Sequence, residues 1–130
     1  MSSGYIVEKW CAKEQDEYDL CAEFMKQYDY LSALNQFKSE LFIFHVANER
    51  KCSIQQRVRL ARMGVVAGVA DYIIFIKDKG WAAIEFKRSE KQMKKLNESQ
   101  SDFRAMAQDF GAPYLLTCSV SEAIDFLMSL

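Results

Sequence analysis

Histidine, proline and glycine are scarce in this 130-residue chain, which contains 1, 1 and 5 of them. The four cysteines stand at Cys11, Cys21, Cys52 and Cys118 and form no C-x-x-C pair. With one histidine and no such pair, we expect no structural zinc site. No basic segment leads into an apolar run, and no stretch approaches the roughly 20 apolar residues that span a bilayer. We therefore expect a cytoplasmic protein that has reduced thiols and no membrane segment.

Hydrophobic residues make up 50% of the chain and aromatic residues 13%, which suffices for a packed core without disulfides. The single proline, Pro113, and the lack of repeats or linkers give no sign of a domain boundary. The sequence therefore predicts one domain that comprises residues 1–130.

The net charge of −1 conceals an uneven distribution along the chain. Residues 50–95 carry 12 basic and 4 acidic side chains, so this third has a charge of +8, while both flanking segments are acidic. A middle third of this kind can bind a polyanion, although solvated lysines and arginines explain the same pattern. The basic residues that flank the predicted hairpin in this third are Arg50, Lys51, Arg57, Arg59, Arg62, Arg88, Lys91, Lys94 and Lys95.

Hydrophobic periodicity predicts a small mixed β-sheet flanked by helices, an α/β fold with the order α-β-α-β-β-α-β-α. Helices are expected at about 7–37, 53–63, 97–110 and 121–128, and strands at 41–46, 71–77, 81–87 and 114–118. The last strand and helix are expected to pack as a crossover unit.

The hairpin at 71–87 brings acidic and basic side chains together. A three-residue loop at 78–80 pairs Asp71 with Lys87 and places Glu85 diagonal to Asp71 on the same face. A two-residue loop would instead turn Asp71 to the opposite face. The three-residue loop therefore predicts a cluster of Asp71, Glu85 and Lys87.

Two carboxylates aimed at one point repel each other unless a cation lies between them. Hard oxygen ligands without nearby sulfur or imidazole suit Mg²⁺ or Mn²⁺. Lys87, two residues after Glu85, lies on the same side and can orient a water or neutralise a phosphate. This combination suits phosphodiester hydrolysis, whereas the structural alternative is a solvent-facing ion pair in an amphipathic strand.

Several short segments together resemble the VRR-NUC domain, a branch of the PD-(D/E)xK nuclease superfamily with a restriction-endonuclease-like core. The segments are Gly64–Asp71, Ile84–Lys87 and Leu96–Gln100, with Phe44–Asn48, Gly111–Tyr114 and Ser121–Ile124 around them. The resemblance covers roughly residues 14–127. The family usually has proline before the motif aspartate, where this chain has Ala70.

The resemblance implies a divalent-metal nuclease in which Asp71 and Glu85 bind the metal and Lys87 is the motif lysine. It also implies that Gln100 opens the following helix beside the site, although Gln100 also suits a capping-box partner of Asn97. A further metal-binding glutamate comes from the first helix in this family. Glu14 fits that position best, Glu17 is a close alternative on the same helix face, and Glu23 is a more distant one.

The function implied by the resemblance is a structure-selective endonuclease for branched DNA, such as flaps or four-way (Holliday) junctions in DNA repair. Stand-alone bacteriophage members of the family tend to be homodimers, and apolar residues of the first helix are a candidate interface. Two alternatives remain open. One is the cleavage subunit of a restriction-type system, and the other is a DNA-binding or assembly module without activity.

Overall fold

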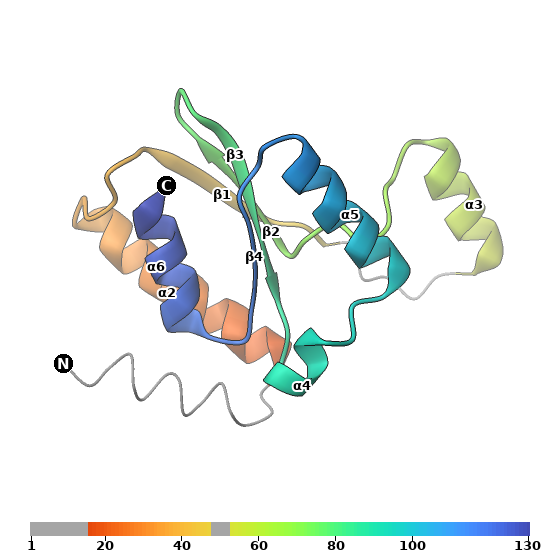
Figure 1. The fold of residues 1–130 in the computed structure, drawn as a ribbon, viewed down its shortest axis with the longest axis horizontal. Coiled ribbons are helices and arrows are strands. Elements are labelled where there is room, and N and C mark those ends of the chain that lie inside the picture. Colours follow the sequence, from red (N-terminus) through yellow and green to blue (C-terminus); the bar gives the residue numbers. More distant parts are fainter. Residues whose placement is uncertain (1–15, 48–52) are drawn as a thin grey trace.

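Four short strands form one mixed sheet, with helices against both of its faces (Figure 1). The computed structural model describes residues 16–47 and 53–130. The strands lie in the order β1-β2-β3-β4; neighbours are antiparallel except β3 and β4, which are parallel. The elements are α2 Glu17–Ala33, β1 Leu41–His45, α3 Ile54–Arg62, β2 Tyr72–Ile76, β3 Gly80–Phe86, α4 Glu90–Met93, α5 Glu98–Asp109, β4 Tyr114–Thr117 and α6 Val120–Ser129. The predicted α/β class is therefore confirmed.

One face of the sheet packs against α2 and α6 and forms the main core. Phe24 of α2 is fully buried, and its ring meets Tyr72 and Phe86 edge to face at centroid distances of 5.1 and 5.3 Å. Alternation in β2 and β3 turns every second side chain to this face, where Ile74 and Ile84 are also fully buried. This dry layer holds the strands that carry the polar cluster described below.

The opposite face is only partly covered, because α5 lies over β3 and β4. Phe103 of α5 packs on Trp81 and Tyr114, at ring centroid distances of 6.3 and 6.4 Å. The half of this face formed by β1 and β2 has exposed aromatic side chains instead, with Phe42 63% and Phe75 51% exposed.

Two predictions about the helices need correction. The helix expected at 7–37 ends at Ala33 within the described residues, because Asn35 takes a left-handed conformation (φ 53) after the Leu34 cap. An additional short helix, α4, follows β3, since Ser89 caps it by accepting a hydrogen bond from the Gln92 amide. The parallel connection from β3 to β4 runs through α4 and α5, so the crossover precedes the last strand rather than following it.

The hairpin register also differs from the prediction. The loop is three residues long but closes one residue earlier, since Ile76 pairs with Gly80 and Asp78 adopts φ 64. Aspartate tolerates this left-handed conformation, which allows the earlier turn. Continuing the observed register by one step places Asp71 opposite Glu85 rather than diagonal to it, and the shift keeps both residues on the same face.

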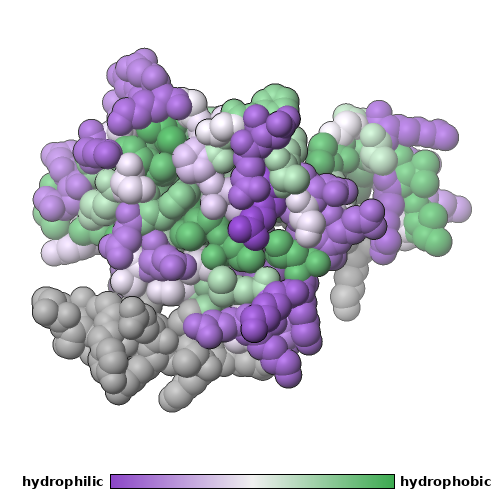
Figure 2. Space-filling model, viewed as in Figure 1, coloured by the Kyte–Doolittle hydropathy of each residue, from purple (hydrophilic) through white to green (hydrophobic). Residues whose placement is uncertain are grey.

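Helix α3 stands apart from the sheet, beyond α5, and has no buried residue (Figure 1). Ser53 begins it with a complete capping box, in which Ser53 and Gln56 each accept a hydrogen bond from the other's backbone amide. Apolar and basic side chains lie together on its surface (Figure 2). Its first residue, Ile54, is 78% exposed. A nine-residue helix with this much exposed apolar surface is held chiefly by its caps.

The structure bears on two further predictions, reduced thiols and the lack of a membrane segment. Cys118 is buried and disulfide-bonded, so the expectation of reduced thiols is wrong for this residue, whereas Cys21 is a free thiol. Within 16–47 and 53–130, no helix is both long and apolar enough to cross a bilayer.

Candidate functional site

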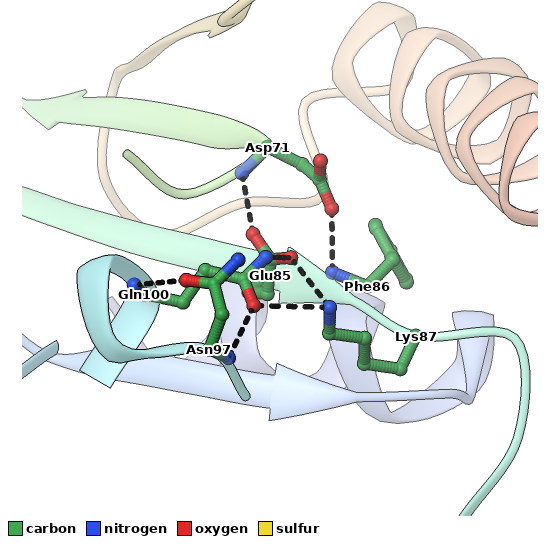
Figure 3. Close-up of polar contacts among 6 residues, drawn as sticks. All are labelled: Asp71, Glu85, Phe86, Lys87, Asn97 and Gln100. Atoms are coloured by element: carbon green, nitrogen blue, oxygen red, sulfur yellow. Dashed lines mark hydrogen bonds and ion pairs between the residues drawn. The ribbon is translucent and has the colours of Figure 1, made fainter. Parts of the chain in front are cut away.

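Asp71 and Glu85 meet where β2 begins and β3 ends, and each side chain is held by the other's strand. The Glu85 carboxylate (Oε1) accepts a hydrogen bond from the Asp71 amide at 3.1 Å. The Asp71 carboxylate (Oδ2) accepts one from the Phe86 amide at 2.7 Å. These reciprocal bonds extend the ladder beyond its last backbone pair and fix both carboxylates at the same end of the hairpin (Figure 3).

Lys87 and Gln100 complete the cluster on the side of Glu85 that faces α5 (Figure 3). The Lys87 ammonium lies 3.7 Å from Glu85 Oε2 and donates to Gln100 Oε1 at 3.3 Å. The Gln100 side-chain amide nitrogen (Nε2) donates to Glu85 Oε2 at 3.2 Å. The Lys87 side chain is only 13% exposed, so its ammonium is well shielded from water. The structure thus brings together four residues that the sequence predicts: Asp71, Glu85, Lys87 and Gln100.

Gln100 serves the helix and the cluster at the same time. Its side chain accepts a hydrogen bond from the Asn97 amide at 3.2 Å, and the Asn97 side chain accepts from the Gln100 amide at 2.9 Å. The capping box expected from the sequence is therefore confirmed. Because one amide group bonds Asn97, Lys87 and Glu85, the first turn of α5 is tied directly to the carboxylates.

Gly68 allows α5 to approach the cluster this closely. It adopts a positive φ of 77, and a Cβ placed there would lie 2.3 Å from the Ser99 carbonyl carbon and 2.6 Å from the Gln100 amide nitrogen. Backbone atoms cannot move aside as a flexible side chain can. A glycine at this position therefore sets the distance between the loop before β2 and the start of α5.

The pKa of Glu85 is raised from 4.5 to about 8, chiefly because burial disfavours its charged form. The negative charge of Asp71 raises it further, whereas Lys87 and the Asp71 amide act in the opposite direction. Glu17, in the first turn of α2, adds a smaller upward contribution. Three carboxylates thus act on one another at this end of the sheet, and a bound cation would relieve their repulsion.

The carboxylates of Asp71 and Glu85 suit a small, hard cation, and they are two protein ligands for it. Mg²⁺ is commonly held by one or two carboxylates and completes its shell with water and substrate phosphate. Asp71 and Glu85 supply two such carboxylates. Across 16–47 and 53–130, no group of three histidine, cysteine, aspartate or glutamate side chains is arranged to hold a metal ion.

The first-helix glutamates have different positions. Glu14 lies outside the described residues, so its proposed role as a ligand remains a prediction. Glu17 is the one whose charge acts on Glu85 and on Cys21. Glu23 accepts a hydrogen bond from Gln27 on its own helix at 2.8 Å. Within the described residues, the electrostatic contact thus favours Glu17 over Glu23.

Sequence reasoning missed two further groups of residues on the face of the sheet that carries Glu85. The hydroxyl of Tyr114 is buried without a hydrogen-bond partner, and its ring lies 5.6 Å from the Arg104 guanidinium. The exposed phenylalanines Phe42, Phe44 and Phe75 share the face of the sheet that carries Glu85. Alternation along 41–45 could have indicated that Phe42 and Phe44 face away from the core.

Comparison of the chain with protein-family models, with curated proteins and with solved structures found no match.

Proposed function

We propose that the chain is a divalent-metal-dependent endonuclease that hydrolyses phosphodiester bonds in branched DNA, such as flaps or four-way junctions. The observation that carries this proposal is the convergence of Asp71, Glu85, Lys87 and Gln100, joined by contacts of 3.1–3.7 Å. The four residues come from the start of β2, the end of β3 and the first turn of α5. Their arrangement suits phosphate chemistry, and they are the residues that the VRR-NUC resemblance selects.

Each side chain has a distinct role in the proposed reaction. Asp71 and Glu85 would hold Mg²⁺ or Mn²⁺, with a first-helix glutamate as a third ligand. The bound ion supplies a Lewis acid and acidifies a water molecule. Lys87 brings a shielded positive charge to the place where negative charge develops on the phosphate, and Gln100 holds Lys87 and Glu85 in position.

The raised pKa of Glu85 is consistent with a ligand that exchanges a proton for a cation. At pH 7 the metal-free carboxyl is largely protonated, so metal binding must release that proton. Calorimetry in buffers with different ionisation enthalpies measures the proton release directly. The proposal predicts release close to one proton at pH 7 and much less at pH 9.

The decisive experiment incubates purified protein with labelled flap, fork, four-way and linear duplex DNA, in Mn²⁺, in Mg²⁺ and in EDTA. We expect metal-dependent cleavage of branched substrates and little cleavage of linear duplex. Asp71→Asn should lose cleavage and bind Mn²⁺ more weakly. Lys26→Ala, an exposed change on α2, is the matched control and should cleave as the unaltered chain does.

The reciprocal hydrogen bonds also support a second candidate, a DNA-binding or assembly module in which Asp71 and Glu85 only cap the end of the hairpin. In that case the protein binds branched DNA but never cuts it in either metal. The same experiment distinguishes the proposed nuclease from a restriction-type cleavage subunit, because such a subunit requires a second chain or a site preference. Cleavage of junctions of unrelated sequence by the protein alone excludes both alternatives.

We further propose that the nuclease acts as a homodimer, because a two-fold enzyme can cut the two symmetric strands of a four-way junction. Helix α2 leaves Tyr18 and Tyr30 exposed at 74% and 67%, and these are the candidate contacts. Light scattering at the concentration used for cleavage tests this proposal. A monomer mass under those conditions would remove it.

A further inference from the structure

The uncovered half of the sheet carries a cluster of three exposed phenylalanine rings, Phe42 and Phe44 from β1 and Phe75 from β2. Phe42 and Phe75 are register partners, and their rings stack at 6.4 Å with an interplanar angle of 11°. Phe44 lies 5.8 Å from Phe75 and 6.1 Å from Phe42. The three side chains are 63%, 38% and 51% exposed in the order Phe42, Phe44, Phe75. We call this cluster the aromatic platform.

The aromatic platform lies on the same face as the carboxylates. Side chains at 71, 73, 75 and 77 point to one side of β2, because successive residues of a strand alternate. Asp71 is four residues from Phe75, which corresponds to about 13 Å along the strand. Lys77, the next residue on this side after Phe75, forms an exposed ion pair with Glu40 at 3.5 Å.

The exposed area of the aromatic platform is small for a protein interface. With about 200 Å² for a whole phenylalanine side chain, the three rings expose on the order of 300 Å². A stable dimer buries about 800 Å² on each partner. One or two nucleobases fit this area better than a second copy of the chain, and stacking on exposed aromatic rings of a sheet is a common way to hold unpaired bases.

We propose that the aromatic platform binds unpaired bases of a single-stranded DNA segment that leads to the cluster of Asp71, Glu85 and Lys87. This inference rests on the proposed function and adds the part of the substrate that the sheet recognises. Stacking holds the bases whatever their sequence, and Lys77 can contact a phosphate beside them. A flap or a fork, which has an unpaired arm, is then preferred to a fully paired junction.

Binding without metal tests the platform separately from cleavage. A fluorescent twelve-nucleotide oligo-dT is titrated in EDTA, and its anisotropy gives the dissociation constant. A second oligonucleotide of equal length with a central tract of abasic sites keeps the phosphates and lacks the bases there. We expect the unaltered chain to bind the abasic oligonucleotide about tenfold more weakly, as loss of one or two stacked bases implies.

Variants at Phe75 separate ring stacking from general apolar contact. Phe75→Leu keeps apolar bulk and should weaken oligo-dT binding about tenfold, whereas Phe75→Tyr keeps a ring and should bind normally. Phe110→Ala, which removes a 74% exposed phenylalanine at the end of α5, is the matched control and should change nothing. With the abasic oligonucleotide, Phe75→Leu and the unaltered chain should bind equally.

Two results overturn the proposal. One is equal affinity of the unaltered chain for the oligo-dT and the abasic oligonucleotide. The other is a change of oligomeric mass in Phe75→Leu with unchanged DNA binding, which assigns the surface to a second copy of the chain. Absence of cleavage with intact, base-dependent binding would contradict the proposed nuclease and leave the platform standing, so the two failures are distinguishable.

Discussion

The two faces of the sheet differ in what covers them and in what they carry. The face against α2 and α6 is closed, and Ile74, Ile84 and Phe86 are fully buried there. The other face is covered by α5 over β3 and β4 alone, and it carries the cluster of Asp71, Glu85 and Lys87 together with the aromatic platform. The comparison indicates that one face supplies stability and leaves the other free for function.

The largest effect should come from the closed face. Phe24→Ala removes a fully buried ring that contacts Tyr72 and Phe86, so it should lower the free energy of unfolding by about 3–5 kcal/mol. Phe75→Ala, on the open face, should cost less than about 1 kcal/mol. Urea unfolding followed by circular dichroism measures both. Equal losses of unfolding free energy in the two variants would show that the closed face contributes no more to stability than the open face.

Lys87→Ala should reduce activity strongly and stability little. We expect cleavage to fall about 10²- to 10³-fold, because a preorganised positive charge beside the phosphate is lost. The fold should persist, because Glu85 is largely protonated at pH 7 and is left without an unpaired buried charge when Lys87 is removed. Single-turnover cleavage and circular dichroism are measured on the same sample. Loss of the folded signal together with activity would assign Lys87 a structural role.

Gly68→Ala tests whether the approach of α5 matters for the cluster. The added methyl group meets backbone atoms of Ser99 and Gln100, so the first turn of α5 must move. We expect a destabilisation of about 1–3 kcal/mol and a reduced cleavage rate in the protein that still folds. Gly64→Ala is the control, because it shares a positive φ (95) but has nothing within 4 Å of the added carbon. A similar rate for both variants would show that strain alone is responsible.

The pH dependence of stability should report on Glu85. Because its pKa is about 8 in the folded chain and 4.5 ordinarily, the folded state binds more protons between these pH values. The free energy of unfolding of the metal-free protein should therefore fall as pH rises through this window, by on the order of 1 kcal/mol per pH unit. Glu85→Gln should flatten the profile. An equally steep decline in that variant would place the titrating group elsewhere.

The smallest effects are expected from substitutions of the first-helix glutamates, which test which of them is the third metal ligand. Glu17→Gln removes a charge that raises the pKa of Glu85, so that pKa should fall towards its ordinary value. Mn²⁺ affinity should weaken about tenfold if Glu17 is also the third ligand. Glu14→Gln serves as the paired variant. A loss of Mn²⁺ affinity in Glu14→Gln alone would return the ligand role to Glu14, the residue that the family resemblance favours.

Much of this fold could be predicted because local signals and periodicity agree. The strands of the hairpin, the Ser53 cap and the capping box of Asn97 with Gln100 all follow from side-chain chemistry over a few residues. Asp71, Glu85 and Lys87 were placed on one face correctly although the register was wrong. The error changed the pairing by two positions, and alternation makes such a shift harmless to the face.

The contacts that were missed depend on distances across the fold. Nothing around Gly68 in the sequence reveals that the backbone of Ser99 will lie against it. The exposure of Phe42 and Phe75 depends on how far α5 reaches over the sheet, which periodicity does not report. The register itself turned on whether Asp78 would adopt a left-handed conformation, which aspartate accepts but does not require.

Gln100 gives the beginning of α5 a use beyond packing. Its amide group joins the Asn97 cap to Lys87 and Glu85, so fraying of this turn breaks the polar cluster at the same moment. Amide hydrogen exchange at residues 98–101 then becomes a gauge of whether the cluster is assembled. A ligand that engages Glu85 or Lys87 changes this exchange rate, even when the ligand itself cannot be observed.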